Sequence, residues 1–273
     1  MVPGAQAEEL QKLAALGALA RALAPNAVET WPESVASWAR DSPAEVPLPL
    51  LGRLVEALRH ENKDILAAVY EHLVSGVNRR RLGTFFTPPA IVKHMMEICQ
   101  KLTPKPDHVV DPGAGVGAFT LEALRIWTSA SVAAVDLNVV TLGLLAARVN
   151  CDTVQSDKSN LNLSAENYLT WIRESWPSLD GVRLVVGNPP YTRNQHMTRK
   201  EKQEAQQAAG DLITSGLAGL SAYFMAATIR ALRPEDAMCL LLPGSWCETR
   251  YGRELREWLW GARNRRIVAY FSQ

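Results

Sequence analysis

The most informative local feature of this sequence is a glycine-rich turn that follows a short apolar run: Val109-Val110-Asp111-Pro112-Gly113-Ala114-Gly115-Val116-Gly117-Ala118-Phe119. The two valines are typical of a buried strand, and a helix is expected to begin at Ala118. Glycines permit positive φ and let a ligand approach the backbone closely. A strand, a glycine turn and a helix in this order predict a ligand crevice at the carboxyl end of a strand in a parallel α/β sheet.

Short apolar runs alternate with helical stretches along much of the chain. The predicted strands cover residues 109–110, 132–135, 184–186, 238–242 and 267–270, and helices are predicted between them at 118–127, 140–149 and 222–232. The strands are almost continuously apolar, as expected for strands that are buried on both faces of a parallel sheet. We therefore predict a doubly wound, Rossmann-like α/β domain over residues 79–273.

The first 78 residues predict a separate helical domain. Leucines recur at helical spacing between Leu10 and Leu23, and helical patterns return over residues 50–59 and 64–74. The intervening stretch 43–49 contains three prolines, which disfavour helix in the residues that precede them. Because we find no chemical motif in residues 1–78, we expect this domain to serve in packing or docking.

Composition places limits on the environment of the chain. It has 29 Lys and Arg against 28 Asp and Glu, so any electrostatic attraction for nucleic acid must be local. No apolar run approaches the roughly 18 residues of a membrane span, and the first residues lead us to expect no secretory signal. The four cysteines are dispersed, which is typical of reduced thiols in a cytoplasmic protein. We expect no metal site and no membrane partner.

Two classes of cofactor fit the glycine-rich turn. The spacing of Gly113, Gly115 and Ala118 satisfies the nicotinamide-dinucleotide fingerprint. However, the Asp111 carboxylate, just before the turn, would repel a pyrophosphate, whereas it suits a cofactor that carries an amino group and a sulfonium. Asp136 ends the next predicted strand, where an acidic side chain can hold ribose hydroxyls. The turn thus favours a methyltransferase and leaves a dehydrogenase open.

A second motif, Asn188-Pro189-Pro190-Tyr191, follows the predicted strand at 184–186. Its two prolines fix φ and end the strand, so that the Asn188 side chain and the Pro189 carbonyl are presented as acceptors at the crevice. Two acceptors can bind both hydrogens of a planar amine, and Tyr191 offers a face for stacking a planar base. The motif predicts transfer to an amine or amide nitrogen, accelerated by positioning.

These two motifs together resemble the gamma-class N6-adenine DNA methyltransferases of restriction–modification and phage-defence systems. The segment Gly83–Pro89 strengthens the likeness, since an aromatic-Thr-Pro element precedes the glycine loop in that family. The resemblance covers roughly residues 79–271. It implies an S-adenosylmethionine-dependent fold, DNA as the partner, and methyl transfer to the exocyclic amine of adenine.

The resemblance also implies roles for individual residues. Cofactor binding is expected from Thr87 and Pro88 at the carboxylate, Asp111, Gly113 and Gly115 at the methionine end, Asp136 at the ribose, and Asn167 and Tyr168 at the adenine. Catalysis is expected from Asn188, Pro189, Pro190 and Tyr191. The family usually has Asp where Asn167 stands, but an amide carbonyl can still accept from the adenine amine.

Other substrates share part of this pattern. Protein glutamine methyltransferases also carry Asn-Pro-Pro-Tyr, although they generally lack the Thr-Pro element and the proline after the Asp of the loop. RNA base methylation is a third alternative.

A duplex DNA substrate would require base flipping, and its phosphates need cations. Candidate basic clusters are Arg79–Arg81, then Arg193, Arg199 and Lys200 followed by Lys202, and finally Arg263, Arg265 and Arg266. The family's catalytic domain normally continues into further strands and a target recognition domain, for which we find no candidate here. We therefore expect a specificity or endonuclease module in the same longer chain or in another subunit.

Overall fold

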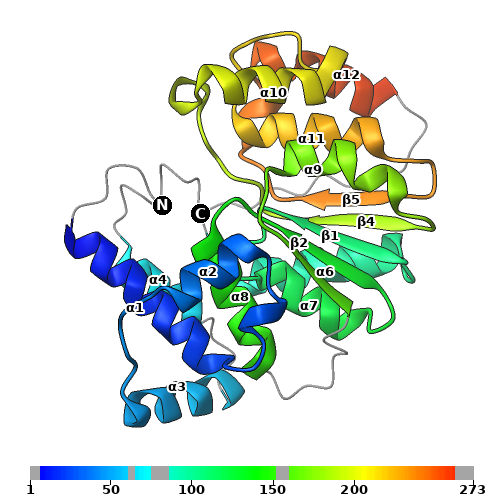
Figure 1. Ribbon diagram of the computed structural model, residues 1–273. Helices are drawn as coiled ribbons and strands as arrows, with labels where there is room; N and C mark the ends of the chain where they lie inside the picture. The colour runs from blue at the N-terminus through cyan, green and yellow to red at the C-terminus, as the bar shows by residue number, and fades with distance from the viewer. Residues whose placement is uncertain (1–6, 61–64, 75–85, 152–159, 262–273) are drawn as a thin grey trace.

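The structure, a computed structural model, describes residues 7–60, 65–74, 86–151 and 160–261. These residues form a parallel sheet with helices on both faces (Figure 1), which confirms the predicted doubly wound α/β fold. The strands are β1 (His108–Pro112), β2 (Ser131–Val135), β3 (Leu161–Ser164), β4 (Arg183–Gly187) and β5 (Ala237–Leu240), in the order β3-β2-β1-β4-β5. The strand predicted at 267–270 lies outside the described residues.

The side chains of the central strands alternate between two apolar cores, one on each face of the sheet. Val109 of β1 and Leu184 of β4 are opposite each other and enter one core, whereas Val110 and Val185 enter the other. All four are completely buried. This double burial explains why the sequence of these strands is continuously apolar.

Helices cover the two faces in separate layers (Figure 1). One layer is α6 (Pro89–Leu102), α7 (Ala118–Ile126) and α8 (Val139–Cys151), and the other is α9 (Tyr168–Glu174), α10 (Arg199–Ala209) and α11 (Leu220–Ala231), with α12 (Arg253–Gly261) beyond it. No helix in the described ranges has the length and hydropathy needed to cross a membrane.

The N-terminal helices pack against α8. They are α1 (Ala7–Leu23), α2 (Glu33–Arg40), α3 (Leu48–His60) and α4 (Ile65–Leu73), and Figure 1 shows them gathered on one side of the sheet. Leu16 of α1, Val35 of α2 and Tyr70 of α4 belong to the same apolar cluster as Leu145 of α8. The N-terminal helices therefore share a core with the sheet and are held close to it.

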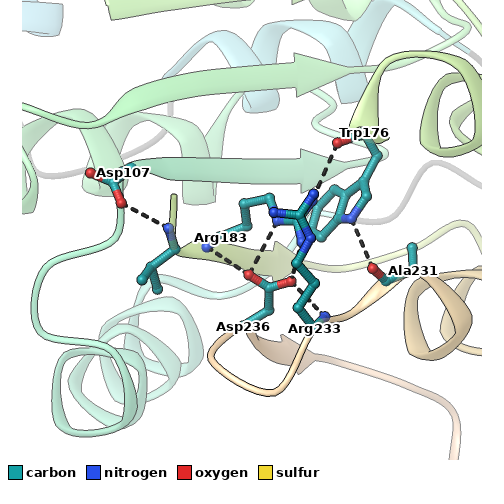
Figure 2. Close-up of polar contacts among 7 residues, drawn as sticks. Asp107, Trp176, Arg183, Ala231, Arg233 and Asp236 are labelled. Atoms are coloured by element: carbon teal, nitrogen blue, oxygen red, sulfur yellow. Dashed lines mark hydrogen bonds and ion pairs between the residues drawn. The ribbon is translucent and has the colours of Figure 1, made fainter. Parts of the chain in front are cut away.

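A buried ion pair joins the amino end of β4 to the turn before β5. Figure 2 shows Arg183 and Asp236 facing each other beside Trp176. Both charged side chains are fully buried, with Nη2 2.6 Å from Oδ2, and the guanidinium lies 4.5 Å from the Trp176 ring centroid. The backbone N–H of Arg183 also donates to Asp236. This network fixes the end of the sheet that lies away from the predicted crevice.

Candidate functional site

A cavity of about 800 Å³ opens at the carboxyl edge of the sheet. It brings together most of the residues that the sequence predicted for the site. The predicted residues on its surface are Thr87, Gly113, Gly115, Asp136, Asn167, Tyr168, Asn188 and Pro190. The others, Pro88, Asp111, Pro189 and Tyr191, are within two positions of these lining residues but do not line the cavity. Asp111 and Pro189 are buried, Tyr191 is half-buried and Pro88 is exposed.

The glycine-rich loop depends on left-handed backbone conformations. Gly117, at the start of α7, has φ of 92°, and a Cβ there would lie 2.1 Å from Leu145 Cδ1. Gly113 has φ of 76°, and its Cβ would lie 3.2 Å from Pro190 Cδ. The missing side chains thus let the loop pack closely against α8 and against the proline motif. As a result, the two motifs that are separated in the sequence form one continuous surface.

Asp136 is held at the cavity by the loop itself. Its Oδ2 accepts from the Gly115 N–H at 2.8 Å, and its Oδ1 accepts from the Asn138 N–H at 2.8 Å. Burial raises the pKa of this carboxyl, while the backbone hydrogen bonds oppose that shift. The two carboxylate oxygens together offer about four acceptor sites, so the side chain is oriented and still able to accept from a ligand.

Asp111 lies beneath the loop and is only 1% exposed. Its Oδ2 accepts from the Thr120 backbone N–H at 3.0 Å and from the Thr120 hydroxyl at 2.7 Å. Its Oδ1 is buried and has no hydrogen-bond partner within the described residues. Burial raises the pKa of Asp111 to about 7, although the Thr120 hydrogen bonds lower it. One oxygen therefore fixes the start of α7, and the other is an unsatisfied acceptor.

The side-chain amide of Asn188 is also only partly hydrogen-bonded. Its amide Nδ2 donates to Thr87 Oγ1 at 3.1 Å. Its Oδ1 is buried and has no hydrogen-bond partner in the part of the chain that the structure describes. Thr87 and Asn188 both line the cavity, so this buried carbonyl oxygen belongs to an oriented side chain of the cavity wall. A buried acceptor of this kind has lost its hydration and favours a ligand with an N–H or O–H group.

The remaining residues of the proline motif support this geometry. Pro189 is buried and Pro190 lines the cavity. The Tyr191 hydroxyl donates to the backbone carbonyl of Leu241 at 3.3 Å, which ties the ring to the segment after β5. Burial raises the pKa of Tyr191 to about 12, so the phenol stays neutral at physiological pH.

Residues of α9 and α11 add aromatic side chains to the cavity wall. Asn167 caps α9, with Oδ1 accepting from the Leu169 N–H at 3.0 Å. Tyr168 is 2% exposed, its hydroxyl shares a hydrogen bond with Thr228, and its ring centroid is 5.0 Å from that of Phe224. Phe224 also lines the cavity, and the sequence interpretation missed it because α11 reads as an ordinary core helix.

The sequence interpretation also missed the contribution of the N-terminal helices. Residues 10, 13 and 14 of α1 and residues 34, 37, 38 and 41, in and just after α2, line the cavity. They carry no motif, and the expectation for residues 1–78 was packing or docking alone. Their place at the site comes from the way α1 and α2 dock on α8, which no local pattern encodes.

The lining carboxylates give the cavity wall a negative charge. The described lining side chains include the carboxylates of Asp41, Asp136, Glu166 and Glu201, and none of them is Lys or Arg. Such a wall attracts a cationic ligand and repels a pyrophosphate. This observation disfavours the dinucleotide alternative that the glycine spacing had left open.

Cations lie just outside the cavity. Arg193, Arg199 and Lys200, which we call the basic segment, are exposed. They alternate with cavity-lining residues such as Thr192 and Thr198. The predicted basic clusters at 79–81 and 263–266, and the segment 83–85 before Phe86, lie outside the described residues.

Comparison with known proteins gives consistent results. The model of the Eco57I restriction-modification methylase family matches residues 120–273. The chain is 29% identical over 182 residues to the type II methyltransferase M.XamI of Xanthomonas campestris pv. amaranthicola, covering 66% of this chain and 33% of that protein. It is 23% identical to the type II methyltransferase M.BsuBI of Bacillus subtilis, covering 67% of this chain and 38% of that protein. The chain thus spans about a third of the length of these curated relatives.

A solved structure shares the fold. The modification subunit of a putative type I restriction enzyme from Vibrio vulnificus YJ016 aligns with a TM-score of 0.51 and 16% identity. The alignment covers 82% of this chain and 46% of that one.

Proposed function

This chain belongs to the Eco57I restriction-modification methylase family, and we propose that it transfers a methyl group from S-adenosylmethionine to the N6 amine of adenine in DNA. The observation that carries the proposal is the Asn188 Oδ1 atom, a buried acceptor without a partner among the described residues. It belongs to a residue of the cavity that also holds the glycine-rich loop. A donor-bearing nitrogen bound at Asn188 would therefore share a chamber with the cofactor.

The residues present fit this cofactor. S-adenosylmethionine supplies an electrophilic methyl group on a positively charged sulfur. The carboxylate-lined wall favours that charge, and the unsatisfied Asp111 Oδ1 is an acceptor suited to the cofactor's ammonium group. Gly113 and Gly115 would lie along the methionine end with Thr87, and Asp136 would hold the ribose hydroxyls. Asn167 and Tyr168 would hold the adenine ring.

Asn188 and Pro189 would prepare the nucleophile. The Asn188 Oδ1 and the Pro189 carbonyl accept the two hydrogens of the exocyclic amine, which leaves the nitrogen lone pair free to face the methyl group. The Thr87 hydroxyl holds the Asn188 amide in this orientation. The methyl–sulfur bond would break as the nitrogen–methyl bond forms, leaving the thioether product, and the methylated nitrogen would release one proton to solvent. Preorganised acceptors stabilise the positive charge that develops on the nitrogen, and the neutral Tyr191 ring would stack on the base.

DNA is supported as the substrate by the exposed basic segment, which alternates with lining residues at the mouth of the cavity. Its cations would neutralise backbone phosphates. A paired adenine cannot enter the cavity, so the target base must be flipped out of the helix.

The proposal is tested by following the methyl group. This chain is incubated with methyl-labelled S-adenosylmethionine and, in separate reactions, duplex DNA with a mismatched adenine, RNA, and a protein mixture, and the products are digested and separated. We expect label in N6-methyladenine of DNA. In Asn188→Ala, transfer should fall by roughly 10²- to 10³-fold, with cofactor affinity unchanged within a few-fold. Label in cytosine, in RNA or in protein glutamine would overturn the assignment.

A further inference from the structure

One face of α2 is turned toward the cavity. Ser34, Ser37, Trp38 and Asp41 are spaced three, four and seven positions from the first, which places them on one side of a helix, and all four line the cavity. This wall lies outside residues 120–273, the part of the chain that the family model matches.

Two glycines allow α2 to approach its neighbours closely. A Cβ at Gly143, inside α8, would lie 2.3 Å from the Trp38 ring. A Cβ at Gly17, inside α1, would lie 1.9 Å from the Ser42 hydroxyl oxygen. Glycine is unfavourable within a helix, so these positions are best explained by the close contacts that they permit. The cavity-facing side of α2 is thereby packed in a defined position.

The end of α2 is clamped by a cation. Arg21 of α1 donates to the backbone carbonyls of Ala39 at 2.8 Å, Arg40 at 2.8 Å and Ser42 at 3.1 Å. The last carbonyls of a helix lack partners within the helix, and a positive charge there is favourable. Asp41 lies between these clamped residues, so its backbone position is fixed relative to α1.

The N-terminal helices are also joined to the loop that carries Asp136. Asn138 Nδ2 donates to the Tyr70 hydroxyl of α4 at 3.0 Å, while the Asn138 backbone N–H donates to Asp136 Oδ1 at 2.8 Å. Asn138 immediately precedes α8, on which Trp38 packs. The α2 wall is therefore on the side of the cavity where Asp136 stands.

Trp38 lines this wall and carries an unsatisfied donor. Its Nε1 is buried and has no hydrogen-bond partner within the described ranges. Asp41 contributes an exposed carboxylate at the same wall. A nucleoside offers the matching groups, because its ring nitrogens and ether oxygen accept hydrogen bonds and its hydroxyl and amino groups donate them.

We propose that α2 forms part of the cofactor site, with Asp41 and Trp38 contacting the nucleoside half of the cofactor on the same side as Asp136. This inference rests on the proposed function. It assigns the N-terminal helices a direct part in ligand binding, and it places the methionine half at the other end of the cavity, beside Thr87 and Gly113.

Titration calorimetry with two ligands tests the placement. S-adenosylhomocysteine carries the amino-acid half of the cofactor, and 5′-methylthioadenosine retains the nucleoside without it. We expect Asp41→Asn to weaken both ligands by a similar factor of about 10, and Trp38→Phe, which keeps an aromatic ring over Gly143, to weaken both by several-fold. Glu56→Gln, an exposed change of the same charge on α3, is the matched control and should leave both affinities unchanged.

The outcomes separate this inference from the proposed function. If the wild-type chain binds both ligands and Asp41→Asn behaves like Glu56→Gln, the α2 assignment is wrong and the proposed function stands. A loss confined to S-adenosylhomocysteine would place Asp41 at the amino-acid half and overturn the placement. If the wild-type chain binds neither ligand, the proposed function itself fails.

Discussion

Thr87 Oγ1 lies 3.1 Å from Asn188 Nδ2, although 101 residues separate them in the sequence. The contact joins the segment before α6 to the carboxyl end of β4, and both residues line the cavity. An Asn amide has one acceptor and one donor group, and Thr87 occupies the donor. The acceptor is thereby left for the substrate, so Thr87 acts on the proposed reaction by positioning Asn188.

Replacing Thr87 should therefore affect turnover more than cofactor binding. Thr87→Val keeps the shape of the side chain and removes the acceptor for Asn188 Nδ2. We expect the methyl transfer rate to fall about 10-fold while the Kd for S-adenosylmethionine stays within threefold. Thr87→Ser, which restores the hydroxyl, should recover most of the rate. A large loss of cofactor affinity with an unchanged rate would show that Thr87 binds the cofactor without orienting Asn188.

The buried carboxyl of Asp111 should limit stability at neutral and alkaline pH. Because its pKa is raised to about 7 in the folded state, folding favours the protonated form, and the stability this provides is lost as pH rises from about 4, where the unfolded carboxyl ionises, to about 7. Asp111→Asn removes the cost of ionising the buried carboxyl. We expect it to raise the free energy of unfolding by about 1–3 kcal/mol at pH 8, with a smaller gain at pH 5, measured by urea denaturation. An equal gain at both pH values would contradict a titrating Asp111.

The same substitution should weaken cofactor binding. The wild-type Kd for S-adenosylmethionine should rise as pH falls below about 7, because protonated Asp111 no longer pairs with the ammonium group. In Asp111→Asn the affinity should be about 10-fold lower at pH 8 and lose this pH dependence. Calorimetry at several pH values would show both effects, and a pH dependence retained by the variant would assign it to another group.

Replacing Asp236 by Asn should lower the free energy of unfolding, whereas the same replacement at Asp111 should raise it. Its carboxylate is fully buried, but it is paired with Arg183 at 2.6 Å and accepts from the Arg233 backbone N–H at 2.7 Å. Asp236→Asn leaves the Arg183 charge buried without a counterion, which costs about 3–5 kcal/mol. Urea denaturation should show this loss at every pH where the chain is folded, and a neutral effect would mean that water reaches Arg183.

The fold was predictable where a short stretch of sequence has a clear apolar pattern. The β1 and β4 strands are continuously apolar because both of their faces are buried, and this pattern is visible in the sequence. The β3 strand was missed because it lies at the edge of the sheet, where Asn162 is exposed and the apolar run is broken. The helix α2 was missed because it is short, and its apolar residues are small apart from Val35 and Trp38.

The parts of the site that have a local sequence motif were also predictable. The glycine loop and the proline motif each have a local pattern, and parallel strands bring their carboxyl ends to one edge. The unsatisfied oxygens of Asp111 and Asn188 could not be predicted, since they depend on which hydrogen bonds Thr120 and Thr87 make after folding. The contribution of α2 depends on helix docking and has no sequence motif.

DNA binding should depend steeply on salt and should use the basic segment. Each phosphate that a cation neutralises releases condensed counterions, so the logarithm of the affinity falls linearly with the logarithm of the salt concentration. Replacing all three residues of the basic segment by Glu should flatten this slope by about two to three and leave S-adenosylmethionine affinity unchanged. Binding should be tighter for duplexes with a mismatch at the adenine, because less pairing energy is lost on flipping. Fluorescence anisotropy over a range of NaCl concentrations measures both effects.

The control for this experiment changes the same charge elsewhere. Lys101, Lys105 and Arg125 are exposed and lie near the amino ends of the strands, away from the cavity. Reversing these three charges alters the net charge equally, so a general electrostatic effect would flatten the slope in both triple variants. A specific phosphate contact predicts the change in the basic segment alone. If neither variant alters the slope, or if the mismatch brings no gain in affinity, the duplex does not lie across the mouth of the cavity, and the basic segment has no part in holding it.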